Sequence, residues 1–548
     1  MADKKIPTAT VIGEDATGKP RLRVQAGFDY SMYRNLNLPG QVQTIFPLTS
    51  GRSEADYRDR AVRAVRDLDR NNEIIRGGID RKTNTIVGAN LRVNPTPAWR
   101  QLGQTPEWAM EFSSRMAAVF QDWAADDRCL CDSEGHYQFG GLMWQAFRCL
   151  AGPDAEVCGV IHYDEGRRRE YNTKWATHVQ LIDPDRLGNP AGKPDGPTLF
   201  RGRQLDQHGR FVGLHIRRGH PNDASNRTDD SEYVYVERET EWGRPMAFHW
   251  FFKRRAGMQR AISNLVTSLR HIKMLDKFDD ATLQNAVVNG ILATFIQTKM
   301  RPDEMAAHLA PAGDEDEYSG FQEKMAAYEE MDLKIGDQRI PVLGPNDEIV
   351  MKRTADAIPG AGEFRSSFHR GFASALGMPA EQLSLDYTQA NYSSIRASGI
   401  DAWRNVMTER HLFVKHVATL IYSAVMEEAI SIGELELPAG APDFYDARQA
   451  YLACSWTGPG MGWVDPLKEA KAARERTDGM FSTLEQENAA QGNNWRDTID
   501  QRAVEQAYAD SVGVTVPAPP GEGAETSTAD DDTDNDAADA AERKEANP

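Results

Sequence analysis

The chain has 548 residues, of which 40% are hydrophobic, and it carries a formal net charge of −19. That length is too great for a single hydrophobic core, so we expect about three or four structural regions. The surplus of carboxylates disfavours a protein that grips DNA through its phosphates, because affinity of that kind comes largely from Lys and Arg.

The chain shows no sign of a membrane segment, a metal site or a cofactor. No apolar run approaches the roughly 18 residues of a spanning helix, and the first residues lack the apolar core of a signal peptide. We therefore expect a soluble intracellular protein. Cys129 and Cys131 lack the partners of a zinc site, and the histidines from His162 to His249 lack helical metal spacing or a nearby carboxylate cluster. We expect reduced, buried thiols.

Residues 1–50 are rich in loop signals, with a hairpin expected over Thr8–Gln25. Within it, Gly13–Lys19 has the Gly-x-x-x-x-Gly-Lys spacing of a phosphate-binding loop, but Pro20 stands where magnesium binding needs Ser or Thr. The segment that follows alternates like a strand instead of opening a helix. We interpret this motif as a hairpin turn and not as a nucleotide site.

Apolar residues at helical spacing dominate the next part of the chain. Residues 56–87 predict one long helix or two, whose alternating Arg and acidic residues we interpret as a solvated or interface salt-bridge face rather than a DNA patch. Further helices are expected at 106–123 and 138–150. From 156 to about 250 the pattern changes to antiparallel strands separated by turns, so the predicted fold class is α+β.

A long helix is expected over 258–299, directly after Lys253-Arg254-Arg255. We favour protein contacts over DNA contacts for this basic triplet, and the sequence alone leaves both open. Residues 300–362 are acidic and broken by prolines, with a strand candidate at 338–343. A short amphipathic helix follows from Phe364 and should end at Gly377, because glycine readily takes the left-handed conformation that closes helices.

A polar loop then leads into another long helix, expected over 393–429. A helix–loop–helix arrangement of this kind can project the loop away from the body of the protein. The lack of a catalytic group nearby indicates a mechanical role. Further on, Asp465 as N-cap and Pro466 in the first turn predict a helix to Arg476, and another is expected over 495–510. After Val514 the composition predicts disorder.

Several separated blocks carry a resemblance. They are Arg66–Asn72 with Ile86-Val87-Gly88, Leu385–Arg396 with Trp403-Arg404, and Trp456–Gly460 with Asp465–Ala470. In this order they resemble the portal proteins of lambda-type tailed bacteriophages. The resemblance covers most of residues 55–510.

The resemblance implies a portal fold in which subunits assemble into a ring around a DNA channel. Its regions would be the N-terminal region and wing at 1–257, a first stem helix at 258–299, the clip at 300–362, a second stem helix at 363–376, a tunnel loop at 377–392, a long helix with a return to the wing at 393–464, crown helices at 465–513 and a disordered acidic tail at 514–548.

The implied function is that of a dodecameric ring at one capsid vertex. DNA would be packaged through it by the terminase motor, retained and later ejected, and neck and tail proteins would dock at its clip. Implied partners are further copies of the chain, double-stranded DNA passing non-specifically, the terminase large subunit, major capsid and scaffolding proteins and a head–tail adaptor, with no membrane and no cofactor. The ring would belong to the virion and be assembled in the host cytoplasm.

Within the tunnel loop, polar and mostly uncharged side chains could touch a phosphate backbone weakly without reading sequence. These candidate residues are Gln382, Ser384, Asp386, Tyr387, Thr388, Gln389, Asn391 and Tyr392. A plain connection between helices, without DNA contact, is the alternative reading of the loop.

Two other functions are weighed against the conduit. The first is a metal-dependent head-assembly enzyme, a nuclease or protease. The chain lacks a Gly-x-Ser-x-Gly elbow and a His-Glu-x-x-His helix, although scattered Asp and Glu could still form a magnesium site. The second is a sequence-specific DNA-binding protein, which is disfavoured by the acidic balance and the lack of a compact basic recognition helix.

Overall fold

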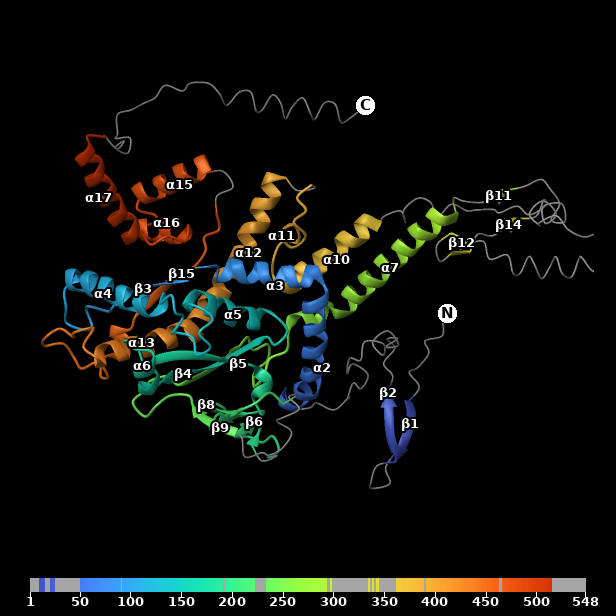
Figure 1. Cartoon of the computed structure of the whole chain (residues 1–548), viewed down its shortest axis with the longest axis horizontal. Coiled ribbons are helices and arrows are strands. Elements are labelled where there is room, and N and C mark those ends of the chain that lie inside the picture. Colours follow the sequence, from blue (N-terminus) through green and yellow to red (C-terminus); the bar gives the residue numbers. More distant parts are fainter. Residues whose placement is uncertain are drawn as a thin grey trace, which may run out of the picture. The chain divides into compact units, whose positions relative to one another are not determined.

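The computed structural model describes residues 9–14, 20–24, 50–89, 91–190, 193–221, 233–292, 296–297, 334–335, 338–339, 342–343, 361–388, 391–462 and 466–514. The chain divides into two compact units, residues 1–464 and 465–548, and each is described by itself (Figure 1). The turn of the phosphate-loop motif, most of the predicted clip, the N-cap Asp465 and nearly all of the acidic tail lie outside the described residues.

The helical region that begins the larger unit consists of two helices, as one of the predicted alternatives had it. Helix α2 (Ser50–Asn71) ends where α3 (Glu73–Ile86) begins, because Asn72 leaves the helical conformation and its side chain accepts a hydrogen bond from Ile75 N at 3.1 Å. The expected helices at 106–123 and 138–150 are confirmed as α4 (Pro106–Ala124) and α5 (Phe139–Ala151).

The predicted antiparallel region forms two sheets. In the first sheet, β4 (Glu156–Tyr163) lies between β5 (Thr177–Ile182) and β10 (Ala247–Phe251). The short helix α6 (Glu165–Glu170) lies between β4 and β5 in sequence. A second sheet has the order β6 (Leu199–Phe200), β7 (Arg203–Leu205), β8 (Phe211–Arg217) and β9 (Tyr233–Glu237). Alternate side chains of β4 face opposite ways, so Val157 packs in the helical core and Val160 packs with Leu214 of the second sheet.

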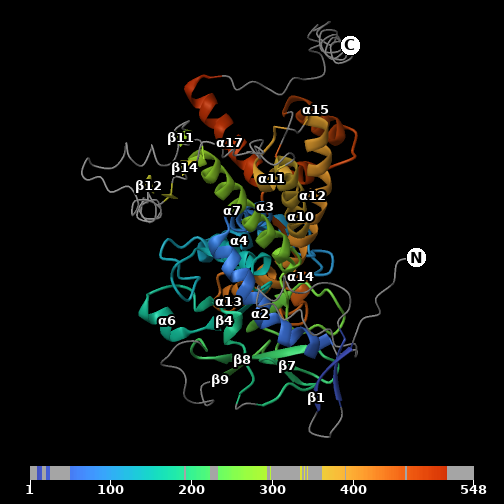
Figure 2. The same ribbon diagram turned by 90° about the vertical axis from the view of Figure 1, so that its right-hand side faces the viewer.

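The segment predicted as one long helix from residue 258 begins later. A 3₁₀ turn, η5 (Asn264–Ser268), leads into α7 (Leu269–Leu292), and residues 258–263 are not helical. The reason is that Arg260 and Ala261 both bind Glu156, which holds their backbone out of the helix. Helix α7 lies beside α10 (Ala361–Leu376), and Leu269, Ile272 and Phe372 share a core with α3 (Figure 2).

The long helix expected at 393–429 is confirmed with one irregularity. Helix α12 (Tyr392–Phe413) and helix α13 (Thr419–Ser431) are joined by a π-helical turn at Val414–Ala418. Beyond α13, helix α14 (Arg448–Tyr451) precedes β15 (Cys454–Thr457), which pairs antiparallel with β3 (Arg92–Pro95). The chain therefore returns to the core formed by its early helices.

The remaining elements are shorter. The N-terminal hairpin is confirmed as β1 (Ala9–Glu14) and β2 (Pro20–Val24). The single strand expected at 338–343 is instead two short strands, β13 (Gln338–Arg339) and β14 (Val342–Leu343), which belong to different sheets. Two-residue strands β11 (Ile296–Gln297) and β12 (Lys334–Ile335) pair with β14 and β13. The second unit consists of α15 (Pro466–Asp478), α16 (Leu484–Ala490) and α17 (Trp495–Val512), confirming both predicted helices there.

Two expectations from composition can be compared with the structure. Among the described residues, no helix combines the length and the apolar character that crossing a membrane requires. All five cysteines are free thiols, but only Cys131 and Cys158 are buried, so the expectation of buried thiols holds for part of the set. Burial raises the pKa of Cys131 to about 12, which keeps it protonated and unreactive.

A fully buried carboxylate, Glu156, joins several of these elements. It accepts hydrogen bonds from Arg58 of α2 at 2.6 Å, from Arg260 at 2.6 Å, from Ala261 N at 3.1 Å and contacts His249 Nε2 of β10 at 3.2 Å. Burial alone would raise the pKa of Glu156, but Arg260 and Arg58 outweigh that effect and hold it well below its usual range. The carboxylate of Glu156 on β4 thus links α2, β10 and the segment that leads into α7.

Replacing Glu156 by Gln should destabilise the protein by about 3–5 kcal/mol, because two buried guanidinium groups lose their counter-charge. Because the pKa of Glu156 is depressed on folding, its contribution is complete above the unfolded-state value of about 4.3 and disappears as the pH falls through the lower folded-state value. Urea unfolding at several pH values measures both effects. As a control, Glu165→Gln on exposed α6 should stay within about 0.5 kcal/mol; an equally small change for Glu156→Gln would contradict this account.

Candidate functional site: the loop between α10 and α12

The predicted tunnel loop at 377–392 is more structured than expected. Helix α10 ends at Gly377, which has a φ of +72°, as the sequence predicted. Directly after Pro379, a short helix α11 (Ala380–Ser384) occupies the first half of the loop. Leu385 then takes a φ of +57° with 61% of its side chain exposed. The irregular part is therefore confined to the few residues before α12.

Hydrogen bonds within that part form a compact polar turn. Asp386 accepts bonds from Thr388 N at 3.1 Å and from Thr388 Oγ1 at 2.7 Å, and these bonds lower the pKa of Asp386. Asn391 then caps α12 by accepting a bond from Ser394 N at 2.8 Å, with Ser394 Oγ accepting in return from Asn391 N. The described residues of the loop tip, 385–388 and 391, are thus solvent-facing, and most of them carry polar side chains.

The structure places the predicted loop residues as follows. Gln382 and Ser384 lie on α11, whereas Asp386, Tyr387, Thr388 and Asn391 are exposed at or beside the tip. Gln389 and the side chain of Tyr392 lie outside the described part of the chain. The described candidates therefore lie on α11 and at the loop tip, most of them facing solvent.

The basic triplet lies apart from the loop tip. Lys253, Arg254 and Arg255 are exposed in the segment after β10. Lys253 and Arg254 line a hollow of about 320 Å³ together with Leu376 at the end of α10 and Glu409 of α12. Two of the three predicted basic residues therefore lie near the base of the loop.

Helix α3 supports the first half of the loop. Arg81 Nη2 donates to Leu383 O of α11 at 2.5 Å, and Lys82 Nζ donates to Leu376 O at 2.9 Å. The same ammonium group pairs with Glu409 of α12 at 2.9 Å. Lys82 thus joins the end of α10, where the loop begins, to the C-terminal part of α12, far along that helix from its start at Tyr392.

A glycine in α3 allows this close packing. A Cβ added at Gly78 would lie 2.6 Å from Leu376 Cδ1 and 2.7 Å from Leu383 Cδ1, and both leucines are buried. Sequence reasoning missed Gly78, Arg81 and Lys82 as parts of the site. The available signal was a glycine pair inside a helical pattern, which often indicates a close packing contact.

Arg410 of α12 joins three parts of the chain that lie far apart in sequence. Its guanidinium donates to Ile86 O, Thr85 O and Pro459 O, each at 2.8 Å, and so satisfies carbonyls at the C-terminal end of α3. Burial lowers the pKa of Arg410 to about 10. The sequence blocks around residues 86, 403 and 459, which carried the resemblance, therefore meet at one side chain.

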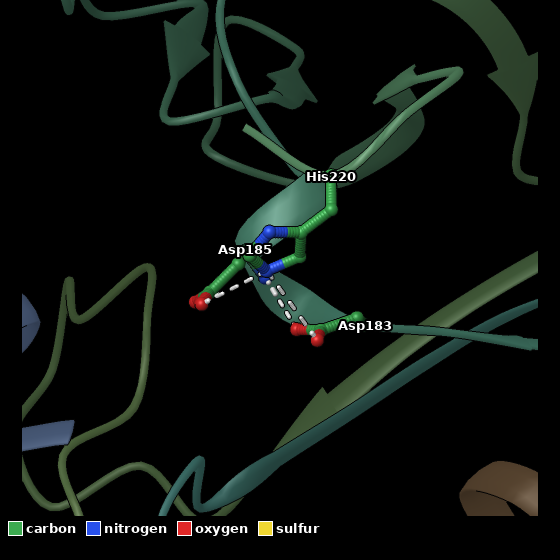
Figure 3. Close-up of side chains that lie close together, drawn as sticks. All are labelled: Asp183, Asp185 and His220. Carbon is green, nitrogen blue, oxygen red and sulfur yellow. Dashed lines mark hydrogen bonds and ion pairs between the residues drawn. The ribbon is translucent and has the colours of Figure 1, made fainter. Parts of the chain in front are cut away.

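One group resembles a metal site, and it was not expected from the sequence. Ligand atoms of Asp183, Asp185 and His220 lie within 4.8 Å of one another (Figure 3). However, Arg66 Nη1 binds Asp185 at 2.5 Å and Arg66 Nη2 lies 3.4 Å from Asp183. A cation here would have to overcome the charge of Arg66, so the arrangement fits an ion-pair network that ties α2 to the segment after β5.

Comparisons with known proteins agree with the resemblance. The family model described as phage portal protein, lambda family, matches residues 44–410. The portal protein of Escherichia phage N15 is 28% identical over 523 residues, which cover 94% of this chain and 95% of the relative. Portal protein B of Escherichia phage lambda is 27% identical over 530 residues, with the same shares covered.

We expect Lys82→Met to weaken the base of the loop. Removing the ammonium leaves Glu409 without its counter-charge and the Leu376 carbonyl without a donor, at a cost of about 1–3 kcal/mol. A double-mutant cycle with Glu409→Gln should give a coupling of about 0.5–3 kcal/mol in the unfolding free energy. The exposed substitution Lys277→Met on α7 serves as the control. A coupling of zero would show that the pair does not hold the two helices together.

Two glycine substitutions form a matched pair. At Gly371 in α10 an added Cβ meets nothing within 4 Å, so Gly371→Ala should stabilise by about 0.5–1 kcal/mol. Gly78→Ala should instead destabilise, by up to about 1–3 kcal/mol, because its methyl overlaps two buried leucines. Thermal unfolding compares the variants, and hydrogen exchange over 380–384 localises the effect. Equal stabilisation by both would contradict the packing described for α3.

Proposed function

The chain belongs to the lambda family of phage portal proteins, and from this premise we propose that it forms the DNA conduit at one vertex of the capsid. The match over residues 44–410 carries the proposal, because it includes α3, the loop and α12 almost to its end. Copies of the chain would form a closed dodecameric ring. Packaged DNA would enter through the channel, be retained and later leave by the same route.

The proposed regions follow the order of elements in the chain. Helices α7 and α10 would form the stem, because they lie side by side and share a core with α3. The sheets and α2 to α5 would form the wing, residues 300–362 the clip and α15 to α17 the crown. Residues 377–392 would form the tunnel loop that narrows the channel.

The chemistry of the loop tip suits a surface past which DNA slides. Apart from the apolar Leu385 and the charged Asp386, its described exposed side chains are polar and uncharged, so they can touch phosphates without the counterion release that makes binding tight. The supports at Arg81 and Lys82 lie behind the tip and do not depend on its side chains. A fixed base with a weakly interacting tip would guide the DNA without holding it.

The proposed partners are those of a particle vertex. They are the terminase large subunit during packaging, the major capsid and scaffolding proteins during assembly, and a head–tail adaptor afterwards. The protein would be assembled in the host cytoplasm and remain in the virion. The cluster at Asp183 and Asp185 gives no support to a metal-dependent nuclease or protease, because Arg66 already pairs with both carboxylates.

Shortening the loop tests this function. We expect replacement of residues 385–390 by two glycines to leave ring assembly intact, since the helices, Lys82 and Glu409 are retained. DNA packaging or retention should be impaired, because the tip no longer reaches the DNA. An in vitro packaging assay followed by nuclease protection measures both steps.

A second variant separates reach from chemistry. Replacing the same residues by Gly and Ser, without changing the length, keeps the backbone and removes the side chains. We expect its defect to be smaller than that of the shortened loop. Normal packaging and normal retention by the shortened variant would refute the tunnel-loop assignment.

A further inference from the structure

A hollow of about 480 Å³ lies between β10 and the end of α12. Arg203 of β7 is among the residues that line it. Its walls are largely aromatic and include Phe211, Trp250 and Phe251. Its polar side chains are those of Arg203, Arg238, His249, Lys253 and His416, and no Asp or Glu is among the described residues that line it. In a chain with a net charge of −19, this local composition is unusual.

Arg203 is buried with incomplete hydrogen bonding. Its side chain stacks over Phe211 and Phe251, with ring distances of 5.1 and 5.4 Å, and only 4% of the residue is exposed. Nη1 donates to Gln259 O at 2.6 Å and to Gln259 Oε1 at 2.8 Å, but Nε is buried and has no hydrogen-bond partner among the described residues. A buried, partly unsatisfied cation of this kind is costly without a nearby anion.

The nearest buried carboxylate is already engaged. Glu156 favours the charged form of Arg203, but burial dominates and lowers the pKa of Arg203 to about 10. Two other guanidinium groups, those of Arg58 and Arg260, bind Glu156 directly. Arg58 also pairs with the half-exposed carboxylate of Asp59 at 3.6 Å, so Arg203 is the one of these three guanidinium groups that makes no ion pair among the described residues.

Among the residues that the structure describes, no carboxylate pairs with the cations nearer the mouth. Lys253 has no ion pair among the described residues, and its pKa is lowered by burial and by the charge of Arg203. Among the described residues, the guanidinium of Arg238 donates to Phe211 O alone, at 3.5 Å. Arg203 is buried, whereas Lys253 and Arg238 lie nearer solvent. Together the three cations form a positively charged site that extends from the interior to the surface.

We propose that this hollow receives an acidic side chain from a second copy of the chain, whose carboxylate is bound between Arg203, Arg238 and Lys253. The inference rests on the ring assembly of the proposed function. In a cyclic ring, the hollow of every subunit would face the same surface of the next subunit. The charged groups would complete one another only in the assembled ring.

A protein carboxylate fits this hollow better than a DNA phosphate. An Asp or Glu side chain has a single charged end that can enter an aromatic-walled space alone, whereas a duplex phosphate is flanked by further charged phosphates that would have to lose water against those walls. The chain has 82 acidic and 63 basic residues, so a second copy brings a surplus of carboxylates. Opposite charges across a protein interface favour a specific orientation of the partners.

Zero-length carbodiimide cross-linking tests the proposal directly, because Lys253 is the one amine that lines the hollow among the described residues. Rings assembled from an equal mixture of ¹⁴N- and ¹⁵N-labelled chains are cross-linked and analysed by mass spectrometry. We expect Lys253 to be joined to an Asp or Glu in peptide pairs of mixed label. Lys253→Arg, which keeps the charge but does not react, should assemble normally and lose this cross-link.

Charge reversal provides the second measurement. Lys253→Glu combined with Arg238→Glu should raise the subunit concentration needed for half-assembly by about tenfold or more, while the unfolding of the free subunit stays unchanged. Arg169→Glu on α6, whose side chain is 82% exposed, is the control reversal and should assemble normally.

The outcomes separate this inference from the proposed function. Rings in which Lys253 forms only same-label cross-links, or none, would overturn the inference and leave the conduit in place. Protection of Lys253 from acetylation only when duplex DNA is added would also overturn it, in favour of a phosphate ligand. Failure of the unmodified chain to form rings even with capsid and scaffolding proteins would refute the proposed function itself.

Discussion

Glu156 binds Arg58 of α2, Arg260 ahead of α7 and His249 of β10, all within the protein interior. Because an isolated buried charge is far more costly than a paired one, these elements cannot separate without exposing or uncoupling several charges at once. The approach to the stem is thereby held against the sheets. Arg66 adds a second tie about two turns further along α2, through Asp154 at 2.7 Å and Asp185 at 2.5 Å. Both networks hold the body of the molecule together independently of the loop.

Helix α3 transfers this rigidity to the loop. It contacts α5 on one side and α10, α11 and α12 on the other, and its C-terminal carbonyls are held by Arg410. Gly78 permits the close approach, and Lys82 ties the end of α10, where the loop begins, to the C-terminal part of α12. A loop whose base is fixed and whose tip is polar can bear against a moving ligand without being displaced. This is the mechanical property that the proposed conduit requires.

Much of this fold follows from local patterns in the sequence. Helical periodicity located α4, α5 and α10, and strand alternation with turn residues located the sheets, because both signals arise from which side of an element is buried. The late start of α7 could not be predicted, since it depends on Arg260 reaching Glu156, a partner that only the tertiary fold supplies. The same holds for Lys82 and for the hollow beside Arg203. Likewise, α11 is stabilised largely by Leu383 packing on α3 and not by its own five residues.

The central claim is that copies of this chain form a ring whose channel is narrowed by residues 377–392. Cryo-electron microscopy of the protein, alone or assembled with capsid and scaffolding proteins, tests it most directly. The account predicts closed rings, near twelve subunits as in the proposed dodecamer, with the turn at Asp386 to Asn391 at the narrowest part of the channel. Rings with this turn on their outer surface would contradict the role given to the loop. Chains that remain unassembled in the presence of capsid and scaffolding proteins would contradict the conduit as a whole.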